Sequence, residues 1–456
     1  MPLSVIILAA GKGSRMKSEK PKVIHKLAGL PMLQHVVNTA RHLNPEQILI
    51  VIGHESHQVE NAMHDQGLIY VEQTEQLGTG HAVLQCSDQL TEGNDLLVLY
   101  GDVPLIKSST LEKLLQQGAA KNAVCLLSFI AENPTGYGRV VRDENNDVQA
   151  IVEEKDADED TRKITESNSG IMFIQGKNGF NLLHSLDNNN AQNEYYLTDV
   201  VRLAVDRDLP VNAVICDDEN EVLGVNNQSQ LAELECIYRR YRAHELMLQG
   251  VKITDPTRID IRGDITVGKD VSIDINCILE GKVELADGVE IGPNCVIKNS
   301  RIGAGTIIQS MCVIESSDLG ENNDIGPYAR IRPETKTQSH AKIGNFVEVK
   351  KSLIGKGSKV NHLTYIGDAE IGENVNVGAG TITCNYDGAY KHKTIIKDNA
   401  FIGSGTQLVA PVLISEGSTI GAGSTITKET PAGKLTFSRA KQVSISSWVR
   451  PSKKQS

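Results

Sequence analysis

Hydrophobic and polar positions alternate in two different ways along the chain, and the change lies near residue 228. In the first part, short aliphatic runs are separated by amphipathic stretches such as 32–42 and 109–117. The aliphatic runs are 5–8, 48–52, 96–100, 123–130, 170–174 and 211–216. Continuous apolar runs separated by helices are typical of strands buried on both faces. We therefore predict an α/β domain with a mostly parallel, Rossmann-like sheet over residues 1–227.

The next stretch of the chain has the spacing of apolar residues that is typical of a helix. Apolar side chains from Leu231 to Tyr241 recur at intervals of three and four residues, and the stretch ends at Gly250. Glycine is a common C-terminal cap because it accepts left-handed backbone angles. We expect residues 228–250 to form a helix that links two domains.

In residues 251–456 the apolar positions recur every six residues from Ile261 to Ile426, with occasional five-residue steps and one interruption between Thr383 and Ile396. Of 28 such positions, 26 are aliphatic, whereas a chain with 40% hydrophobic residues would supply about 11 by chance. The two exceptions are Thr337 and Thr383. Neither an amphipathic helix nor a half-buried strand has this period, but it is the signature of a hexapeptide-repeat β-helix. We predict such a β-helix, followed by a C-terminal tail.

Composition narrows the class of protein. Acidic residues outnumber basic ones, 57 to 46, which argues against a nucleic-acid-coating protein or a polybasic membrane binder. No apolar run is long enough to cross a membrane. The eight cysteines form no metal-like spacing, and Cys277, Cys295 and Cys312 should stack on one wall of the β-helix. We expect residence in the cytoplasm.

A glycine-rich segment follows the first strand, with the sequence L-A-A-G-K-G-S-R-M and Pro21-Lys22 shortly after it. Glycines at the end of a strand free backbone N–H groups to bind an anion, and Lys12, Arg15 and Lys22 add positive charge. The segment lacks the G-x-x-x-x-G-K-[ST] pattern of a Walker A loop. It is not a G-x-G-x-x-G motif either, because Met16 takes the third glycine position. From these residues alone, a phosphate site and a simple turn both stay open.

Asp102 follows the aliphatic strand 96–100. A carboxylate at the end of a strand can hold a hard cation such as Mg²⁺, although a lone aspartate there is more often a helix cap.

The extended string from Leu8 to Lys22 resembles the signature of sugar-phosphate nucleotidyltransferases. That resemblance implies that the loop binds the triphosphate, that Arg15 stabilises the leaving pyrophosphate, and that Asp102 and Asn226 hold Mg²⁺. It also implies contacts to UTP or to UDP-N-acetylglucosamine by Leu8, Ala9, Ala10, Gly11, Gly13, Lys22, Gln73, Gly78, Thr79, Tyr100, Gly101, Asp102, Gly138, Glu153, Asn168 and Asn226. Gln73, Gly78 and Thr79 correspond to the uracil-reading loop, and Gly138, Glu153 and Asn168 to the sugar contacts.

The β-helical part contains the string G-S-K-V-N-H-L-T-Y, in which His362 follows an inward aliphatic residue. An isolated histidine is usually an ordinary surface residue, but an ammonium group must lose a proton before it attacks a thioester, and imidazole titrates in the right range. The string resembles the catalytic segment of glucosamine-1-phosphate acetyltransferases, whose β-helices wind left-handed. The resemblance implies that His362 is the base.

The same resemblance implies two sets of binding residues. Glucosamine 1-phosphate would contact Arg332, Lys350, Tyr365 and Asn376, and acetyl-coenzyme A would contact Ala379, Asn385, Tyr386, Ser404, Ala422 and Arg439. The polar segment between Thr383 and Ile396 reads as a loop that leaves the β-helix, with a plain surface loop as the alternative. A nucleophilic dyad of Cys384 and His392 is a further, weaker alternative.

Both parts in this order resemble the bacterial bifunctional enzymes that combine N-acetylglucosamine-1-phosphate uridylyltransferase with glucosamine-1-phosphate N-acetyltransferase. That resemblance implies a homotrimer, acetyl-coenzyme A as co-substrate, and a product that feeds peptidoglycan and lipopolysaccharide synthesis. One departure is Val360-Asn361 before the histidine, where a smaller pair is often seen. Two rival hypotheses are a nucleotidyltransferase whose β-helix only oligomerises or regulates, and a non-catalytic sugar-nucleotide scaffold.

Overall fold

The computed structural model describes residues 2–11, 13–53, 56–63, 67–91, 93–120 and 123–453 of the 456-residue chain. The chain divides into two compact units, and the division falls between Tyr238 and Arg239. This division falls inside helix α7 (Gln228–Leu248), which the sequence analysis treated as a separate link. Gly250, just after α7, has a φ of 97°. No helix in the described ranges is both long and apolar enough to cross a lipid bilayer.

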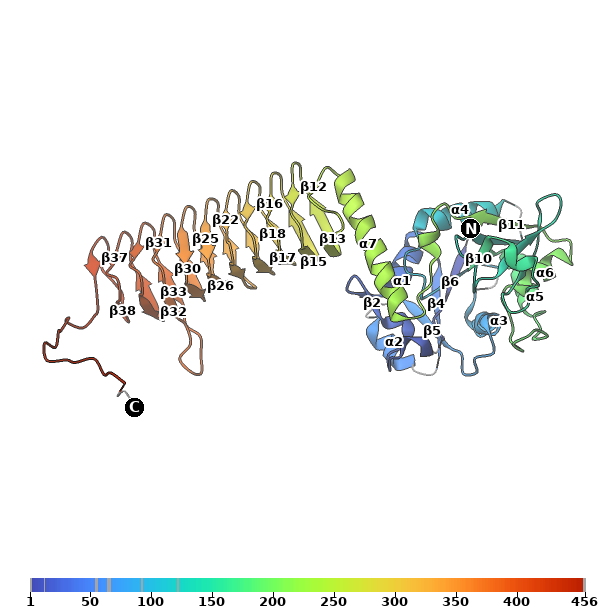
Figure 1. Ribbon diagram of the computed structural model, residues 1–456, viewed down its shortest axis with the longest axis horizontal. Coiled ribbons are helices and arrows are strands. Elements are labelled where there is room, and N and C mark those ends of the chain that lie inside the picture. Colours follow the sequence, from blue (N-terminus) through green and yellow to red (C-terminus); the bar gives the residue numbers. More distant parts are fainter. Residues whose placement is uncertain are drawn as a thin grey trace. The chain divides into compact units, whose positions relative to one another are not determined.

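Unit 1 is built on a nine-stranded sheet whose main path runs β11-β7-β10-β6-β1-β4-β5 (Figure 1). These strands are β1 (Leu3–Leu8), β4 (Gln47–Ile52), β5 (Leu68–Glu72), β6 (Asp95–Tyr100), β7 (Val124–Ile130), β10 (Glu166–Ile174) and β11 (Val211–Ile215), with β8 (Arg139–Arg142) and β9 (Val148–Val152) off the path. Parallel pairs join β1 with β4 and β6, β4 with β5, and β7 with β11, whereas β10 runs antiparallel to β6 and β7. The α/β fold with a mostly parallel sheet is confirmed. The run 170–174 lies in the antiparallel strand β10, and β8 also pairs antiparallel with β9 and β10.

Helices cover both faces of this sheet. They are α1 (Met32–His42), α2 (Ser56–Ala62), α3 (Thr79–Leu84), α4 (Ser108–Ala119), α5 (Gly176–Leu183) and α6 (Asp199–Val205). Val5 and Ile7 of β1 point into one apolar core and Ile6 into the other. Because both faces are buried, the strand is a continuous aliphatic run with no polar alternation.

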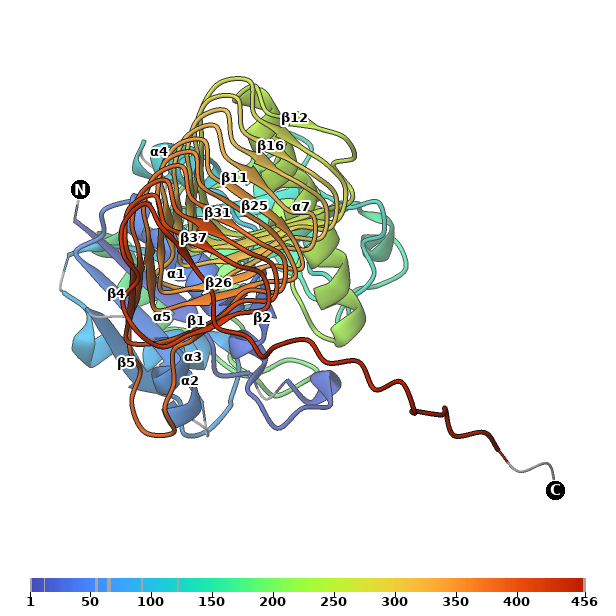
Figure 2. The same cartoon turned by 90° about the vertical axis from the view of Figure 1, so that its left-hand side faces the viewer.

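Unit 2 is a β-helix of parallel strands with three walls, and Figure 2 shows its coils nearly superposed along their axis. One wall is an 11-stranded sheet of β12 (Lys252–Ile253), β14 (Ser272–Ile273), β16 (Glu290–Ile291), β19 (Ile307–Ile308), β22 (Asp324–Ile325), β25 (Lys342–Asn345), β28 (Lys359–His362), β31 (Asn376–Val377), β34 (Phe401–Ile402), β37 (Thr419–Ile420) and β39 (Leu435–Thr436). The other two walls form one 17-stranded sheet of β13 (Ile259–Val267), β15 (Cys277–Leu285), β17 (Val296–Lys298), β18 (Arg301–Ile302), β20 (Val313–Glu315), β21 (Asp318–Leu319), β23 (Arg330–Ile331), β24 (Lys336–Thr337), β26 (Glu348–Lys350), β27 (Leu353–Ile354), β29 (Tyr365–Gly367), β30 (Ala369–Ile371), β32 (Ile382–Cys384), β33 (Thr394–Ile396), β35 (Gln407–Val409), β36 (Val412–Ile414) and β38 (Thr425–Ile426).

The six-residue period of the sequence is the inward face of these walls. Every position of the period is buried except Val267, which is partly buried, and Thr337 and Thr383 are buried too. The cysteines Cys277, Cys295 and Cys312 are fully buried on successive coils, which confirms their predicted stacking. Burial raises the pKa of the Cys277 thiol to about 12, so it stays protonated.

Candidate functional sites

A cavity of about 370 Å³ lies at the carboxyl ends of β1 and β6 in unit 1. It brings together many of the sequence-predicted nucleotide contacts, namely Leu8, Ala9, Ala10, Gly11, Lys22, Gln73, Gly78, Thr79, Tyr100 and Asp102. These segments meet because β1 and β6 are parallel neighbours, and the Gly101 N–H donates to the Leu8 carbonyl at 2.9 Å. Ligands of open α/β sheets bind at this edge.

Two oxygens from distant segments converge on one cation beside this cavity. The Lys22 ammonium contacts Asp102 Oδ2 and lies 3.3 Å from Asn226 Oδ1. Arg15 Nη2 also donates to Asn226 Oδ1, at 2.8 Å. Asp102 is not a helix cap, because α4 begins only at Ser108. The sequence-predicted pair of metal ligands therefore lies together, with the predicted arginine and lysine around it.

This arrangement fits a hard divalent cation. A carboxylate and an amide oxygen are ligands that Mg²⁺ prefers, and Mg²⁺ commonly keeps waters and substrate phosphates as its remaining ligands. The position of the Lys22 ammonium shows that a positive charge fits between Asp102 and Asn226. Within the described ranges, no group of three or more His, Cys, Asp or Glu side chains converges as for an all-protein metal centre.

The glycine-rich loop is folded back on Lys22. Gly13 has a φ of 57°, and a Cβ there would lie 2.7 Å from the Cβ of Lys22. At Gly11 the same added atom would meet nothing within 4 Å, so this glycine leaves the backbone open towards the cavity. Lys12, the other predicted cation of the loop, lies outside the described residues.

The predicted uracil-reading loop is closed by a segment far along the chain. The buried Gln73 donates to the Gly78 carbonyl at 3.1 Å. Gly78 has a φ of 110°, and a Cβ there would lie 2.6 Å from the Tyr195 carbonyl oxygen. Thr79 Oγ1 accepts the Leu197 N–H at 3.1 Å. Glycine at position 78 is thus required both by its backbone angles and by the close approach of residue 195.

The three predicted sugar contacts lie together, with Gly138 just before β8, Glu153 just after β9 and Asn168 in β10. The Asn168 N–H donates to the Gly138 carbonyl at 2.8 Å, and a Cβ on Gly138 would lie 3.4 Å from Glu153 Oε1. Burial raises the pKa of Glu153, although Thr198 donates to its Oε1 at 3.2 Å. A half-buried acceptor next to a bare glycine is suited to a sugar hydroxyl.

Tyr100 joins the sugar contacts to the nucleotide cavity. A Cβ on Gly170 would lie 2.6 Å from the Tyr100 ring, so β10 and β6 approach closely there. The pKa of Tyr100 is raised by burial first, and then by the charges of Glu153 and Asp102. These charges act on one phenol because the sugar contacts and the metal ligands lie on either side of it.

Three residues of this site were missed in the sequence analysis. Gln76 donates to the Ala10 carbonyl, Glu194 lines the cavity, and Tyr195 packs on the loop at Gly78. A signal for Gln76 existed in its position within the loop that follows β5. Glu194 and Tyr195 lie more than a hundred residues away, and no local pattern assigns them to this place.

In unit 2, His362 lies at a corner of the β-helix. Its Nδ1 is 2.7 Å from Asn345 Oδ1, and the two residues are partners in the pairing of β25 with β28. Since a carbonyl oxygen accepts, Nδ1 donates its proton and Nε2 keeps a lone pair. The His362 side chain is exposed. Asn345 was not singled out from the sequence, although its spacing of 17 residues, about one coil, is a signal that could have found it.

Four predicted acetyl-coenzyme A contacts continue this corner, coil by coil. The Gly380 N–H, next to Ala379, donates to the His362 carbonyl at 3.3 Å. The same pattern links Gly405 to Ala379 at 2.7 Å and Gly423 to Ser404 at 2.8 Å, and Arg439 Nη1 reaches the Ala422 carbonyl at 3.0 Å. The structure thus aligns His362 with Ala379, Ser404, Ala422 and Arg439 along one edge.

The predicted sugar-phosphate contacts gather on a neighbouring wall. Arg332 and Lys350 follow each other on adjacent coils, and the charge of Tyr365 acts on Arg332. Lys391 is the missed member, because its side chain meets Lys350 and lowers the pKa of that lysine. Neighbouring positive charges repel unless an anion lies between them, so Lys350 and Lys391 fit a phosphate, whereas Arg332 already pairs with Glu348 at 2.7 Å.

Asn376, the fourth predicted contact, is not placed in that cluster, since it pairs with Lys359 and Phe401 on the wall before the corner.

The polar segment between β32 and β33 leaves the β-helix, as Figure 1 shows. Asn385 is buried at its base and donates to Asp368 at 2.6 Å, whereas Tyr386 is exposed. The dyad of Cys384 and His392 is not formed. His392 Nε2 lies 2.7 Å from Asp387 Oδ2, and the Cys384 thiol donates to Gln407 Oε1 at 3.7 Å.

Comparisons with known proteins find a transferase domain in each of the two units. Residues 5–168 match the MobA-like NTP transferase domain, residues 261–337 the GMPPB C-terminal domain, and residues 393–428 the bacterial transferase hexapeptide repeats. The chain is 52% identical to the bifunctional protein GlmU of Marinobacter nauticus over 452 residues, which cover 99% of each chain. It is 52% identical to that of Chromobacterium violaceum, over 99% of both chains, and 51% identical to that of Acinetobacter baylyi, over 99% of this chain and 100% of the relative.

The chain belongs to the bifunctional GlmU family. It is therefore an enzyme with a nucleotidyltransferase in unit 1 and a hexapeptide acyltransferase, on a left-handed β-helix, in unit 2. The fold and the family expected from the sequence are confirmed. Full-length likeness to bifunctional relatives also disfavours both rival hypotheses, the oligomerising β-helix and the non-catalytic scaffold.

Proposed function

We propose that this protein makes UDP-N-acetylglucosamine in two steps. Unit 2 acetylates glucosamine 1-phosphate with acetyl-coenzyme A, and unit 1 then transfers UMP from UTP to N-acetylglucosamine 1-phosphate, with release of pyrophosphate. The observation that carries the proposal is that each unit holds its own polar site in a chain related over its whole length to bifunctional proteins. The product would supply peptidoglycan and lipopolysaccharide synthesis in the cytoplasm.

In unit 1 the chemistry is the neutralisation of crowded oxyanions. A sugar phosphate that attacks the α-phosphate of UTP brings two anions together, so catalysis rests on alignment and positive charge. Lys22 and Arg15 already contact the oxygens of Asp102 and Asn226, and both side chains can turn to phosphate oxygens. Asp102 and Asn226 would hold Mg²⁺, which would supply positive charge against the phosphate oxygens.

In unit 2 the chemistry is general base catalysis. Nε2 of His362 accepts a proton from the sugar amine while the nitrogen forms a bond to the acetyl carbonyl carbon. The carbon–sulfur bond then breaks, and coenzyme A leaves as the thiol after its sulfur takes the proton from Nε2 of His362. Arg332, Lys350 and Lys391 would bind the sugar phosphate, and the edge through Ala379, Ser404 and Ala422 would bind acetyl-coenzyme A.

We further propose a homotrimer. Met311, Tyr328, Phe346 and Leu363 occupy successive coils at the corner of His362, and all four are exposed. The Tyr328 and Phe346 rings stack with centroids 5.1 Å apart. A continuous apolar edge beside a catalytic residue supports coverage by a second copy of the chain. Light scattering should report the mass of three chains.

The test is an assay with glucosamine 1-phosphate, acetyl-coenzyme A, UTP and Mg²⁺, in which one component is omitted at a time. His362→Ala should lower coenzyme A release by about 10²- to 10⁴-fold and leave pyrophosphate release from N-acetylglucosamine 1-phosphate unchanged. Asp102→Ala should do the reverse. If either substitution impaired both reactions equally in folded protein, the assignment of one site to each unit would be wrong.

A further inference from the structure

We infer that Glu221 is a positioning residue for the nucleotidyl-transfer site, because it joins the two segments that carry Asp102 and Asn226. This inference rests on the proposed function of unit 1. It concerns a residue that lies outside the cavity and contacts neither the two oxygens nor the loop around them.

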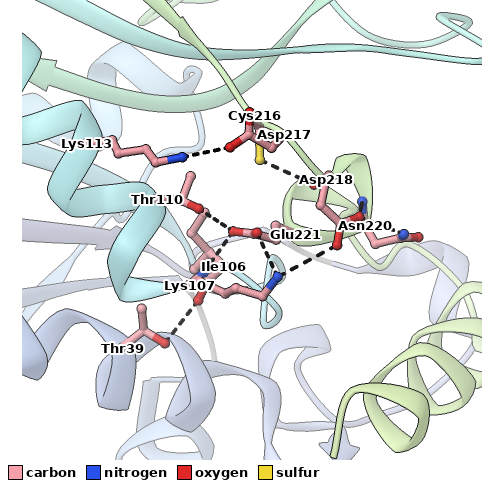
Figure 3. A network of polar contacts seen from close by, with 10 residues as sticks. All are labelled: Thr39, Ile106, Lys107, Thr110, Lys113, Cys216, Asp217, Asp218, Asn220 and Glu221. Atoms are coloured by element: carbon pink, nitrogen blue, oxygen red, sulfur yellow. Dashed lines mark hydrogen bonds and ion pairs between the residues drawn. The ribbon is translucent and has the colours of Figure 1, made fainter. Parts of the chain in front are cut away.

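Glu221 is a buried carboxylate in the short 3₁₀ helix η5 (Glu219–Val222), and only 5% of it is exposed. Figure 3 shows it between Lys107 and Thr110. Its Oε1 lies 2.9 Å from the Lys107 ammonium, and its Oε2 accepts the Thr110 hydroxyl at 2.6 Å and the Lys107 backbone N–H at 3.3 Å. The carboxylate therefore binds the residue before α4 and the first turn of that helix.

These contacts join two backbone segments, residues 102–107 and residues 221–226, into a closed ring. Lys107 lies five residues after Asp102, and Asn226 lies five residues after Glu221. At the other end of the ring, the Val225 N–H donates to the Asp102 carbonyl at 3.0 Å. Two short segments from distant parts of the chain are thus joined at both ends, and each carries one proposed metal ligand.

Further hydrogen bonds stabilise the conformation of this ring. The Thr39 hydroxyl donates to the Ile106 carbonyl at 3.1 Å, and Asp218 caps η5 by accepting the Asn220 N–H at 3.1 Å (Figure 3). Burial alone would lower the pKa of Lys107, but its hydrogen bond and charge pairing with Glu221 raise it above its usual range. The Lys107 ammonium therefore stays protonated at neutral pH.

A neighbouring ion pair provides a matched control. Lys113 and Asp217 lie 2.7 Å apart in the same region, but their side chains are 61% and 82% exposed. Surface pairs contribute little because water and salt screen them, whereas a buried carboxylate that loses a donor is left with an uncompensated charge. The contacts of Glu221 differ from this surface pair because its carboxylate is buried, although the Lys107 side chain is 46% exposed.

The consequence is geometric. Asp102 Oδ2 and Asn226 Oδ1 must lie a few ångströms apart to share one cation. Asp102 follows β6 by two residues, and the Asn226 N–H donates to Gln230 Oε1 of α7 at 2.7 Å, so each is held on one side by a regular element. The ring through Glu221 adds a second constraint on their separation. Residues that orient the ligands of a metal typically change metal affinity about 10- to 100-fold when they are replaced. Glu221 should therefore act on the affinity for the metal more than on the chemical step.

The experiment uses the full chain with Glu221→Gln, Lys107→Met and the control Asp217→Asn. Pyrophosphate release is followed against Mg²⁺ concentration, and Mn²⁺ binding with fixed UTP is followed by the loss of the aqueous Mn²⁺ resonance, corrected for UTP alone. Glu221→Gln should raise half-saturation by both metals about 10-fold, with kcat at saturating Mg²⁺ largely restored. Lys107→Met should shift it in the same direction by less, and Asp217→Asn should behave as the wild type.

Two results would overturn the inference. One is an unchanged metal half-saturation in folded Glu221→Gln and Lys107→Met proteins. The other is a lower kcat without any shift in half-saturation, because that result indicates loss of folded enzyme only. Failure of the proposed function is distinguishable, since the wild-type protein would then release no pyrophosphate at all.

Discussion

The Nδ1 atom of His362 lies 2.7 Å from the amide oxygen of Asn345, its partner on the preceding coil of the β-helix. Because an amide oxygen can only accept, this contact favours one tautomer of the imidazole and leaves Nε2 ready to take a proton. The reactivity of His362 is thus linked to the stacking of two coils.

Replacement of Asn345 should impair acetyl transfer without affecting the other reaction. We expect Asn345→Ala to lower kcat for coenzyme A release by about 10- to 100-fold, because the imidazole loses its orientation and its tautomer preference. A thiol-reactive dye measures this release. Pyrophosphate release by the same preparation is the control, and an unchanged kcat for acetyl transfer would contradict the proposed role.

Lys22 and a divalent metal should compete for the same place. In Lys22→Ala the oxygens of Asp102 and Asn226 lose their cation. We expect a lower Tm without metal and a larger rise in Tm on addition of Mg²⁺ than in the wild type, because no ammonium must be displaced. Differential scanning calorimetry measures both, with the exposed Lys26→Ala as control. An equal or smaller rise in Tm would contradict this.

Replacement of Glu153 by the neutral glutamine should make unit 1 more stable at neutral pH. Burial raises its pKa, so the fold favours the protonated acid. The cost of ionisation is therefore absent below about pH 4, the usual range of glutamate, and appears as the pH rises through the raised pKa. Glu153→Gln should have a higher Tm than the wild type at pH 7, and the difference should vanish near pH 4. A difference independent of pH, or one as large in the exposed Glu159→Gln, would contradict the prediction.

Two glycines allow the proposed acetyl-coenzyme A edge to be tested with a matched pair. Gly405 and Gly417 have φ values of 70° and 63°, and a Cβ on either would meet only another glycine at 3.7–3.9 Å. Alanine should therefore cost each position about 1 kcal/mol of stability through its backbone angles. Only Gly405→Ala, on the edge through Ser404, should also raise KM for acetyl-coenzyme A. Equal KM values for both variants would argue against this edge as the binding path.

The fold was predictable because its determinants are local. The six-residue period marks the inward face of unit 2 directly, since each aliphatic residue fills the same place on its own coil. The continuous apolar runs of unit 1 likewise follow from burial on both faces. The antiparallel direction of β10 was not predictable, because the same apolar run suits either direction.

The sites were predictable only where a motif names them. Asp102, Asn226 and His362 stand in recognisable strings, but the residues proposed to position them, Glu221 and Asn345, depend on which segments the fold pairs. Lys391 illustrates the difficulty. It reads as a solvated lysine of a surface loop, and its role follows only from the return of that loop to Lys350.

The stacking of the β-helix also determines the end from which it should unfold. An inner strand such as β37 pairs on both sides, with β34 and β39, whereas β39 pairs with β37 alone among the described strands. Fraying on heating or proteolysis should begin at this open end, where Ser404 and Ala422 lie close by. The acetyltransferase activity should then be lost before the uridylyltransferase activity of the same preparation.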